Sequence, residues 1–125
     1  MRSMTNQEMF DAAWNGLKAQ DWQRSVREFK DVNGTVFTTE CRYNGPNGLH
    51  CAFGYCLTPT ERELVQEGDS ARGVAKALDL DLDGTFANRL QKCHDQSQSP
   101  EDMQYRLRNL AKDYNLTIPS ETSDA

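Results

Sequence analysis

One segment departs from the helical spacing that governs most of this chain, and it constrains the fold more than any other feature. Residues 24–43 contain an Asn-Gly pair at 33–34, which is typical of a hairpin turn because both residue types tolerate positive φ. After this pair the side chains alternate, with Phe37, Cys41 and Tyr43 on one face. The alternation predicts a half-buried strand in a small antiparallel sheet.

Helical patterns surround this segment. Thr5 and Glu8 form a capping box, and apolar residues then recur at helical spacing over residues 6–19. Further helices are predicted over residues 51–57, after a cap at Thr60, over residues 71–78, and after caps at Asp83 and Ser99. The prediction is therefore an α+β fold, a mostly helical single domain over residues 1–118 with about five helices. Its small antiparallel sheet comes from residues 24–43, with 48–51 as a possible further strand, and residues 119–125 are expected to form a disordered tail.

Charge and hydropathy exclude several classes of function. The net charge is −5, and all of it arises from residues 51–125, so the basic face typical of nucleic-acid binding is missing. No stretch is apolar enough to span a membrane, and no signal peptide is evident at the N-terminus. We expect a cytoplasmic protein with reduced cysteines, without nucleic-acid or membrane partners. Large aliphatic residues are few, so the predicted core is light and a homo-oligomer is possible.

The stretch CRYNGPNGLHCAFGYC, residues 41–56, holds three of the four cysteines. One interpretation is a catalytic site, in which Cys51 at a helix start is the nucleophile, His94 a base and Asp95 its orienting partner. A second is a zinc-supported module, although a helix would hold Cys51 and Cys56 too far apart around its axis to share one ion. The third and favoured interpretation is a structural elbow with an exposed turn.

A calcium loop is also suggested, by the DLDLDG sequence at residues 79–84. Such a loop needs a bidentate glutamate at its twelfth position, where this chain has Leu90. A capped helix start at Asp83 explains the pattern better. We therefore expect no metal site and no cofactor.

The sequence CRYNGPNGLHCAFG resembles the Cys-x-Tyr-x-Gly-Pro-x-Gly-x-x-Cys-Ala-x-Gly signature of small uncharacterised proteins of tailed bacteriophages and prophages. The similarity continues in LQKCHD at residues 90–95 and RLRNLAKDYNL at residues 106–116. Family members often continue with a Leu-Ile-Pro-like segment, where this chain has Tyr-Cys-Leu-Thr-Pro at 55–59. The resemblance implies a cytoplasmic accessory protein that binds host components, including defence systems.

The leading hypothesis is therefore a non-enzymatic binding protein that acts on a host or phage protein, as an accessory factor or inhibitor of a host system. Its predicted contact surface consists of the turn and its flanks, namely Tyr43, Asn44, Gly45, Pro46, Asn47, Gly48 and His50. The alternatives are a small-ligand-binding protein or cysteine-dependent enzyme that uses Cys51 with His94 and Asp95, and a zinc-supported structural module.

Overall fold

Five α-helices and one two-stranded antiparallel sheet make up residues 2–119, the part of the chain that the computed structural model describes, and they confirm the predicted α+β class. The helices are α1 (Asn6–Ala19), α2 (Pro59–Leu64), α3 (Ala71–Ala77), α4 (Gly84–Asp95) and α5 (Pro100–Asp113). The strands are β1 (Val26–Lys30) and β2 (Val36–Cys41), and two short 3₁₀ segments span Pro46–Gly48 and Phe53–Cys56.

Local signals set the starts of the long helices. Thr5 caps α1, and its predicted capping box with Glu8 is confirmed. Asp83 accepts a hydrogen bond from the Phe86 N–H at 3.1 Å, so the acidic loop before α4 ends in a helix cap, as the sequence analysis favoured. Ser99 caps α5 in the same way.

The cap of α2 was predicted wrongly. Thr58 rather than Thr60 accepts the Glu61 N–H, and Pro59 occupies the first helical position. Proline suits this position because its fixed φ is already helical and the missing N–H has no partner there. The helix therefore starts before Thr60.

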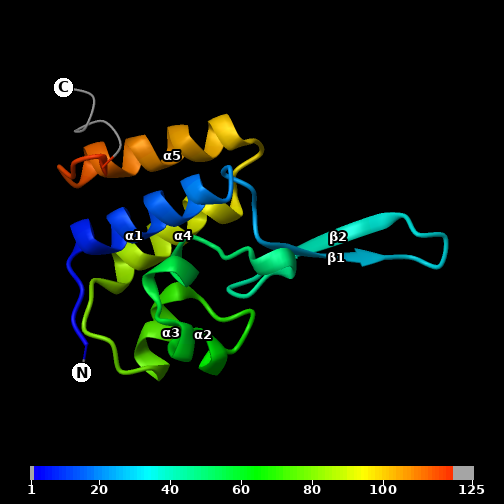
Figure 1. Cartoon of the computed structure of the whole chain (residues 1–125), viewed down its shortest axis with the longest axis horizontal. Coiled ribbons are helices and arrows are strands. Elements are labelled where there is room, and N and C mark those ends of the chain that lie inside the picture. Colours follow the sequence, from blue (N-terminus) through cyan, green and yellow to red (C-terminus); the bar gives the residue numbers. More distant parts are fainter. Residues whose placement is uncertain (1, 120–125) are drawn as a thin grey trace.

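The core lies among α1, α4, α5 and the 3₁₀ segment Phe53–Cys56, with α2 and α3 packed on one side (Figure 1). Its largest fully buried side chains include two that are polar. They are Trp14, Phe10, Phe53, Phe86, Met9, Leu17, Leu90, Met103, Leu107, His94, Cys51 and Ser25. Burial of these side chains from distant parts of the sequence is the main source of stability.

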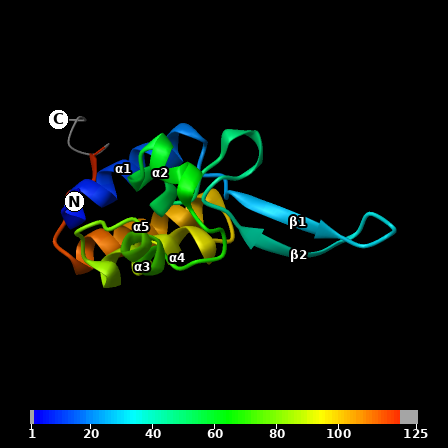
Figure 2. The ribbon, with the colours of Figure 1, turned by 90° about the horizontal axis from the view of Figure 1, so that it is seen from below.

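The strands form a hairpin that projects away from the helices, as Figures 1 and 2 both show. We call residues 26–41 the hairpin arm. The sheet is thus confirmed, but the expectation of a half-buried strand is wrong, because Phe37 is 67% exposed and most of β2 faces solvent. The loop covers residues 31–35, and only Gly34 of the Asn-Gly pair takes positive φ, at +80°.

Two further expectations differ from the structure. Residues 48–51 form no strand, since only β1 and β2 pair within residues 2–119 apart from one isolated bridge. The segment predicted as a helix over residues 51–57 is the shorter 3₁₀ segment Phe53–Cys56. A Cβ on Gly54 would lie 3.0 Å from the Tyr43 carbonyl oxygen, so the absence of a side chain there lets this segment approach the end of the hairpin arm.

The C-terminal part of the predicted tail, residues 120–125, lies outside the described residues. Between residues 2 and 119, no helix has the length and apolar character needed to cross a bilayer.

Candidate functional site

The predicted contact surface is exposed in its centre and buried at one end. We call residues 44–48 the rigid turn. Asn44, Pro46 and Asn47 are exposed. Tyr43, predicted as part of this surface, is instead 4% exposed, and its hydroxyl donates to the Asp69 carbonyl at 2.7 Å. The Tyr43 side chain therefore anchors the turn from inside the protein. It does not belong to the exposed contact surface.

Hydrogen bonds fix the backbone of the rigid turn from both sides. The Gly45 N–H donates to the Leu49 carbonyl at 2.8 Å, which closes the turn. At its start, both oxygens of the Glu67 carboxylate accept backbone N–H groups, from Tyr43 at 2.8 Å and from Asn44 at 3.0 Å. The Asn44 side chain also donates to a carbonyl of α2 at 2.8 Å. The turn thus holds one shape without a partner.

Gly45 is required by this geometry. A Cβ on Gly45 would lie 2.0 Å from the Oγ of Ser25, a buried residue whose hydroxyl donates to the Leu49 carbonyl at 3.2 Å. Asn47 and Gly48 both take left-handed φ, at 60° and 74°. Asparagine and glycine are the residues that accept this conformation most readily. The turn sequence is therefore explained by its backbone.

His50 closes the far end of the turn. It is partly buried, and its Nδ1–H donates to the Tyr43 carbonyl at 2.9 Å. Gln20, which directly follows α1, binds both sides of the His50 backbone: its Nε2–H donates to the carbonyl at 2.8 Å and its Oε1 accepts the N–H at 3.1 Å. The Tyr55 hydroxyl donates to the same Gln20 oxygen, and the Tyr55 ring packs edge-on against His50. These contacts tie the turn to α1.

Gly16 has no side chain and so leaves room for the Tyr55 ring. The substitution Gly16→Ala is expected to destabilise the protein by about 1–2 kcal/mol. A Cβ at this position would lie 2.2 Å from the ring, so Tyr55 must move and lose its contacts with Gln20 and His50. The overpacking penalty exceeds the gain in helix propensity, which is about 1 kcal/mol at most. Urea unfolding of the two proteins measures the difference.

A matched background tests the cause. In a Tyr55→Ala protein, the same Gly16→Ala change meets no ring, so we expect it to stabilise the helix by about 0.5–1 kcal/mol. An equal loss of stability in both backgrounds would contradict the role assigned to Tyr55.

The structure brings His94 and Asp95 together with a different cysteine from the one predicted. We call Cys41, His94 and Asp95 the Cys41 cluster, since their ligand atoms all lie within 4.8 Å of one another. Cys41 ends β2, and the other two residues end α4. Cys51, the predicted nucleophile, lies in the core with no exposed surface. Sequence spacing could not select Cys41, because the cluster forms only when the base of the hairpin meets α4.

His94 is fully buried and its two ring nitrogens have different roles. The Ser25 N–H donates to Nε2 at 2.8 Å, so Nε2 has no proton and Nδ1 carries it. Nδ1–H then donates to the Asp95 Oδ1 at 2.8 Å. Gln91 donates to the same oxygen at 2.7 Å and accepts the Phe53 N–H at 2.8 Å. The residues form a continuous hydrogen-bonded network from the hairpin base to the core.

This network does not suit a metal ion. A metal on Nδ1 would move the ring proton to Nε2, where it would face the Ser25 N–H donor at 2.8 Å. A metal on Nε2 would displace the same backbone group. Binding would therefore leave a buried N–H group without an acceptor, which costs about 1–3 kcal/mol. The donor set favours a structural role for His94.

The pKa values of the thiols are shifted in the opposite direction from those of nucleophilic cysteines. Burial, with the charge of Asp95 and a hydrogen bond to it, raises the pKa of Cys41 to about 12. Burial also raises the pKa of Cys51 above its ordinary value, that of Cys56 to about 12 and that of Cys93 to about 11. Catalytic thiols have lowered pKa values because the thiolate is the reactive form. Cys51 with His94 and Asp95 therefore lacks both the geometry and the acidity of a nucleophilic site.

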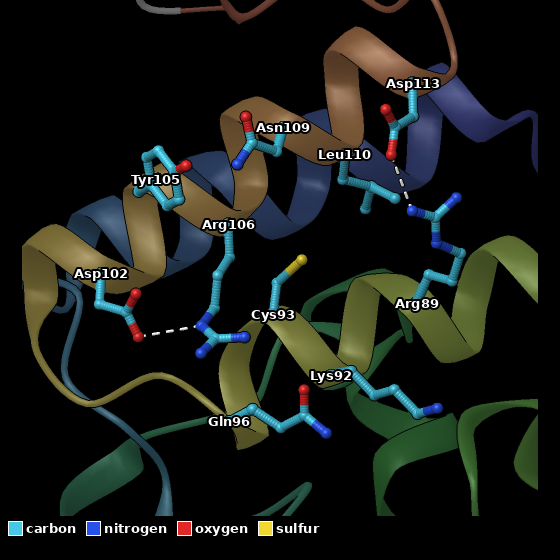
Figure 3. A pocket seen from close by; sticks show the side chains of 10 residues that line it. All are labelled: Arg89, Lys92, Cys93, Gln96, Asp102, Tyr105, Arg106, Asn109, Leu110 and Asp113. Atoms are coloured by element: carbon cyan, nitrogen blue, oxygen red, sulfur yellow. Dashed lines mark hydrogen bonds and ion pairs between the residues drawn. The ribbon is translucent and has the colours of Figure 1, made fainter.

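A hollow of about 380 Å³ lies between α4 and α5 and was not anticipated from the sequence (Figure 3). Its walls carry two ion pairs, Arg106–Asp102 at 2.9 Å and Arg89–Asp113 at 2.8 Å, and Cys93 points between the helices. The i,i+4 spacing of Asp102 and Arg106 is visible in the sequence, but the pairing across helices is not. Each guanidinium already has a carboxylate partner, and Lys92 is the remaining cation of the lining.

Comparisons of the whole chain with protein-family models, with curated proteins and with solved structures gave no match. The resemblance to phage and prophage proteins therefore stays a prediction.

Proposed function

We propose that this protein is a non-enzymatic binding protein that presents the rigid turn, residues 44–48, to a partner protein. One observation carries the proposal: exposed side chains at Asn44, Pro46 and Asn47 stand on a backbone that internal hydrogen bonds already fix. Binding by a rigid loop avoids the entropic cost of ordering it, which is a large part of the cost of association.

The chemistry of the thiols supports a binding role over the cysteine-dependent alternative. Raised pKa values at all four cysteines leave little thiolate at neutral pH. The Cys41 cluster is explained by hydrogen bonds that hold the base of the hairpin arm, including the one from Ser25 to His94. Its role in the proposal is to support the rigid turn, since Ser25 also contacts the carbonyl of Leu49.

The partner that we propose is a protein of the host bacterium or of the phage. This part of the proposal rests on the resemblance to phage and prophage proteins, which also motivates a cytoplasmic location and an inhibitory action on a host system. The exposed amide group of Asn47 suits a partner surface with exposed backbone or side-chain hydrogen-bonding groups.

Removing the exposed side chains of the turn is expected to abolish partner capture without unfolding the protein. The double variant Pro46→Ala with Asn47→Gly keeps the Pro46 carbonyl and allows the positive φ of residue 47, while removing both side chains. We expect at least a tenfold loss of affinity for the captured protein, because truncating the few hot-spot side chains at the centre of an interface typically costs about 2 kcal/mol or more. Affinity capture from bacterial lysate followed by calorimetry with the purified partner measures it.

A control variant carries Glu101→Ala and Lys112→Ala, two exposed positions on α5. It should bind like the unmodified protein, and both variants should unfold at the same temperature as the parent within a few degrees. If every captured protein binds the turn variant and the parent equally, the rigid turn is not the contact surface and the proposal fails.

A further inference from the structure

We propose that the hairpin arm also joins two copies of this chain, by antiparallel pairing of β1 with β1 of a second copy. The result is a four-stranded sheet in the order β2–β1–β1–β2, with a two-fold axis at Phe29. This proposal goes beyond the binding function above, because it uses the outer edge of β1 and a different partner. It is argued from the hydrogen-bonding pattern, the charges and the exposed apolar residues of the arm.

The outer edge of β1 presents backbone groups at every second residue. The Arg42 N–H donates to the Ser25 carbonyl at 2.8 Å, so this pair lies at a hydrogen-bonded position of the ladder. Such positions alternate with non-bonded ones along an antiparallel pair. In β1 the residues Val26, Glu28 and Lys30 therefore direct their N–H and C=O groups away from β2. The pairing with β2 shifts by one residue between Phe29 and Lys30, but the extra residue, Phe37, belongs to β2, so the alternation along β1 continues. A second strand can use these groups, as exposed strand edges commonly do.

A two-fold axis at Phe29 gives the self-pairing with matched charges. It places Glu28 opposite Lys30 of the second copy and Lys30 opposite its Glu28, at positions where both residues have outward backbone groups. Just beyond the strand, Arg27 comes near Asp31 of the second copy, the first loop residue, whose Oδ1 also accepts the Asn33 and Thr35 N–H groups. Directly opposite residues of unlike charge stabilise a sheet and like charges destabilise it. The self-complementary charges therefore select this register.

Neighbouring registers lack this match. An axis at Glu28 sets the two copies of Glu28 against each other, an axis at Arg27 opposes two arginines, and an axis at Lys30 opposes two lysines. Self-pairing along β2 offers no ion pair, because its single charged residue is Glu40.

Exposed apolar residues of the hairpin arm would also become less exposed to solvent in the dimer. Val32 is fully exposed in the loop that follows β1, and the Phe29 register brings this loop close to Val26 of the second copy. Beside Val26, a hollow of about 700 Å³ lies between β1 and the turn residues 44–46, on the side that the tip of the second hairpin approaches. Phe29 itself is partly covered by the Arg27 guanidinium, 4.8 Å from the ring centre, and meets its copy at the axis. Exposed apolar side chains on a projecting edge are otherwise a liability.

Charge exchange tests the pairing and its register together. We expect the unmodified protein to form a dimer in sedimentation equilibrium at micromolar to millimolar concentration. Glu28→Lys alone sets lysine against lysine, and Lys30→Glu alone sets glutamate against glutamate, so each should raise the dimer Kd by about tenfold or more. A 1:1 mixture of the two variants restores both opposite-charge pairs and should form heterodimers. The double variant with both changes should dimerise like the unmodified protein.

Both positions are exposed, so circular dichroism and the unfolding temperature should stay unchanged in every variant at a protein concentration at which the unmodified protein is monomeric. Lys112→Glu on α5, a charge reversal far from the arm, is the matched control and should leave the dimer intact. A protein that stays monomeric at millimolar concentration overturns the proposal. So do single variants that dimerise as the parent does, or a mixture that fails to recover association. Because turn residues 44–46 also line the hollow beside β1, partner capture is measured at a protein concentration at which the unmodified protein is monomeric, so that the two proposals can fail separately.

Discussion

Raising the pH from 9 to 11 is expected to unfold this protein cooperatively. Cys51, Cys56 and Cys93 are buried, and burial holds their pKa values above the ordinary value of 9.0, at about 12 for Cys56 and about 11 for Cys93. The Cys56 thiol also donates to the Met9 carbonyl at 3.4 Å, a bond that the thiolate cannot make. In the unfolded chain these thiols lose their protons near pH 9.

The sign of the effect follows from proton binding. Between pH 9 and the raised pKa values, the folded protein keeps thiol protons that the unfolded chain releases, so each rise in pH favours unfolding. The stabilisation is complete below pH 9 and is lost as the pH rises through the folded pKa values. In this pH range each thiol lowers the free energy of unfolding by about 1.4 kcal/mol for each pH unit, so three thiols lower it by about 4 kcal/mol for each pH unit. The total free energy of unfolding of a domain is roughly 5–15 kcal/mol. Above pH 10 the raised pKa of Tyr43, caused mainly by burial, acts in the same direction.

Urea unfolding at pH 8, 9, 10 and 11 under reducing conditions measures this dependence. A Cys56→Ala variant provides the comparison: it starts from lower stability, because it loses packing, but its stability should fall less steeply above pH 9, by about 1.4 kcal/mol per pH unit. Parallel curves for the two proteins would show that this thiol is not responsible for the alkaline transition.

Replacing His94 by leucine is expected to cost about 3 kcal/mol of stability. Leucine fills a similar volume, but it leaves the buried Ser25 N–H without an acceptor and Asp95 without one of its donors. A buried donor without a partner costs about 1–3 kcal/mol, and the altered packing adds to this figure. The base of the hairpin arm should also loosen, because the bond from Ser25 connects it to α4. Urea unfolding gives the stability, and amide exchange at Ser25 reports the local effect.

Two further variants distinguish the contribution of the His94 hydrogen bonds to stability from that of its packing. His94→Gln places an oxygen near the position of Nε2 and should recover part of the loss, since the Ser25 N–H regains an acceptor. Lys92→Leu introduces the same leucine at an exposed position on the same helix and should change stability by about 0.5 kcal/mol or less. Equal destabilisation by His94→Leu and His94→Gln would indicate that packing, not hydrogen bonding, makes His94 important.

Features encoded by neighbouring residues could be predicted from the sequence. The bounds of α1 and the caps Thr5, Asp83 and Ser99 match the structure, because each depends on side chains within one helical turn. The exposed centre of the rigid turn was found for the same reason. Asparagine, glycine and proline restrict or extend φ locally, whatever the rest of the chain does.

Features that depend on distant residues could not be predicted. The alternation in β2 is the same whether a hairpin lies on a core or projects from it, so it could not show that Phe37 is exposed. Tyr43 is buried because Asp69 and Glu67, more than 20 residues later, accept its hydrogen bonds. Cys41 rather than Cys51 meets His94 because the hairpin base packs on the end of α4. None of these contacts has a signal in local spacing.

The anchoring of the hairpin arm at both ends has a consequence for how the sequence can change. Ser25 and Tyr43 fix the points where the chain leaves and re-enters the helical body, and the residues between them make few contacts with it. The arm is therefore open to variation in length. Adding or removing one residue on each strand preserves the ladder and moves only the tip, whereas a change in one strand alone shifts the faces of that strand. Evolution, or a protein engineer, can thus alter the reach of the arm while the turn and core stay as they are.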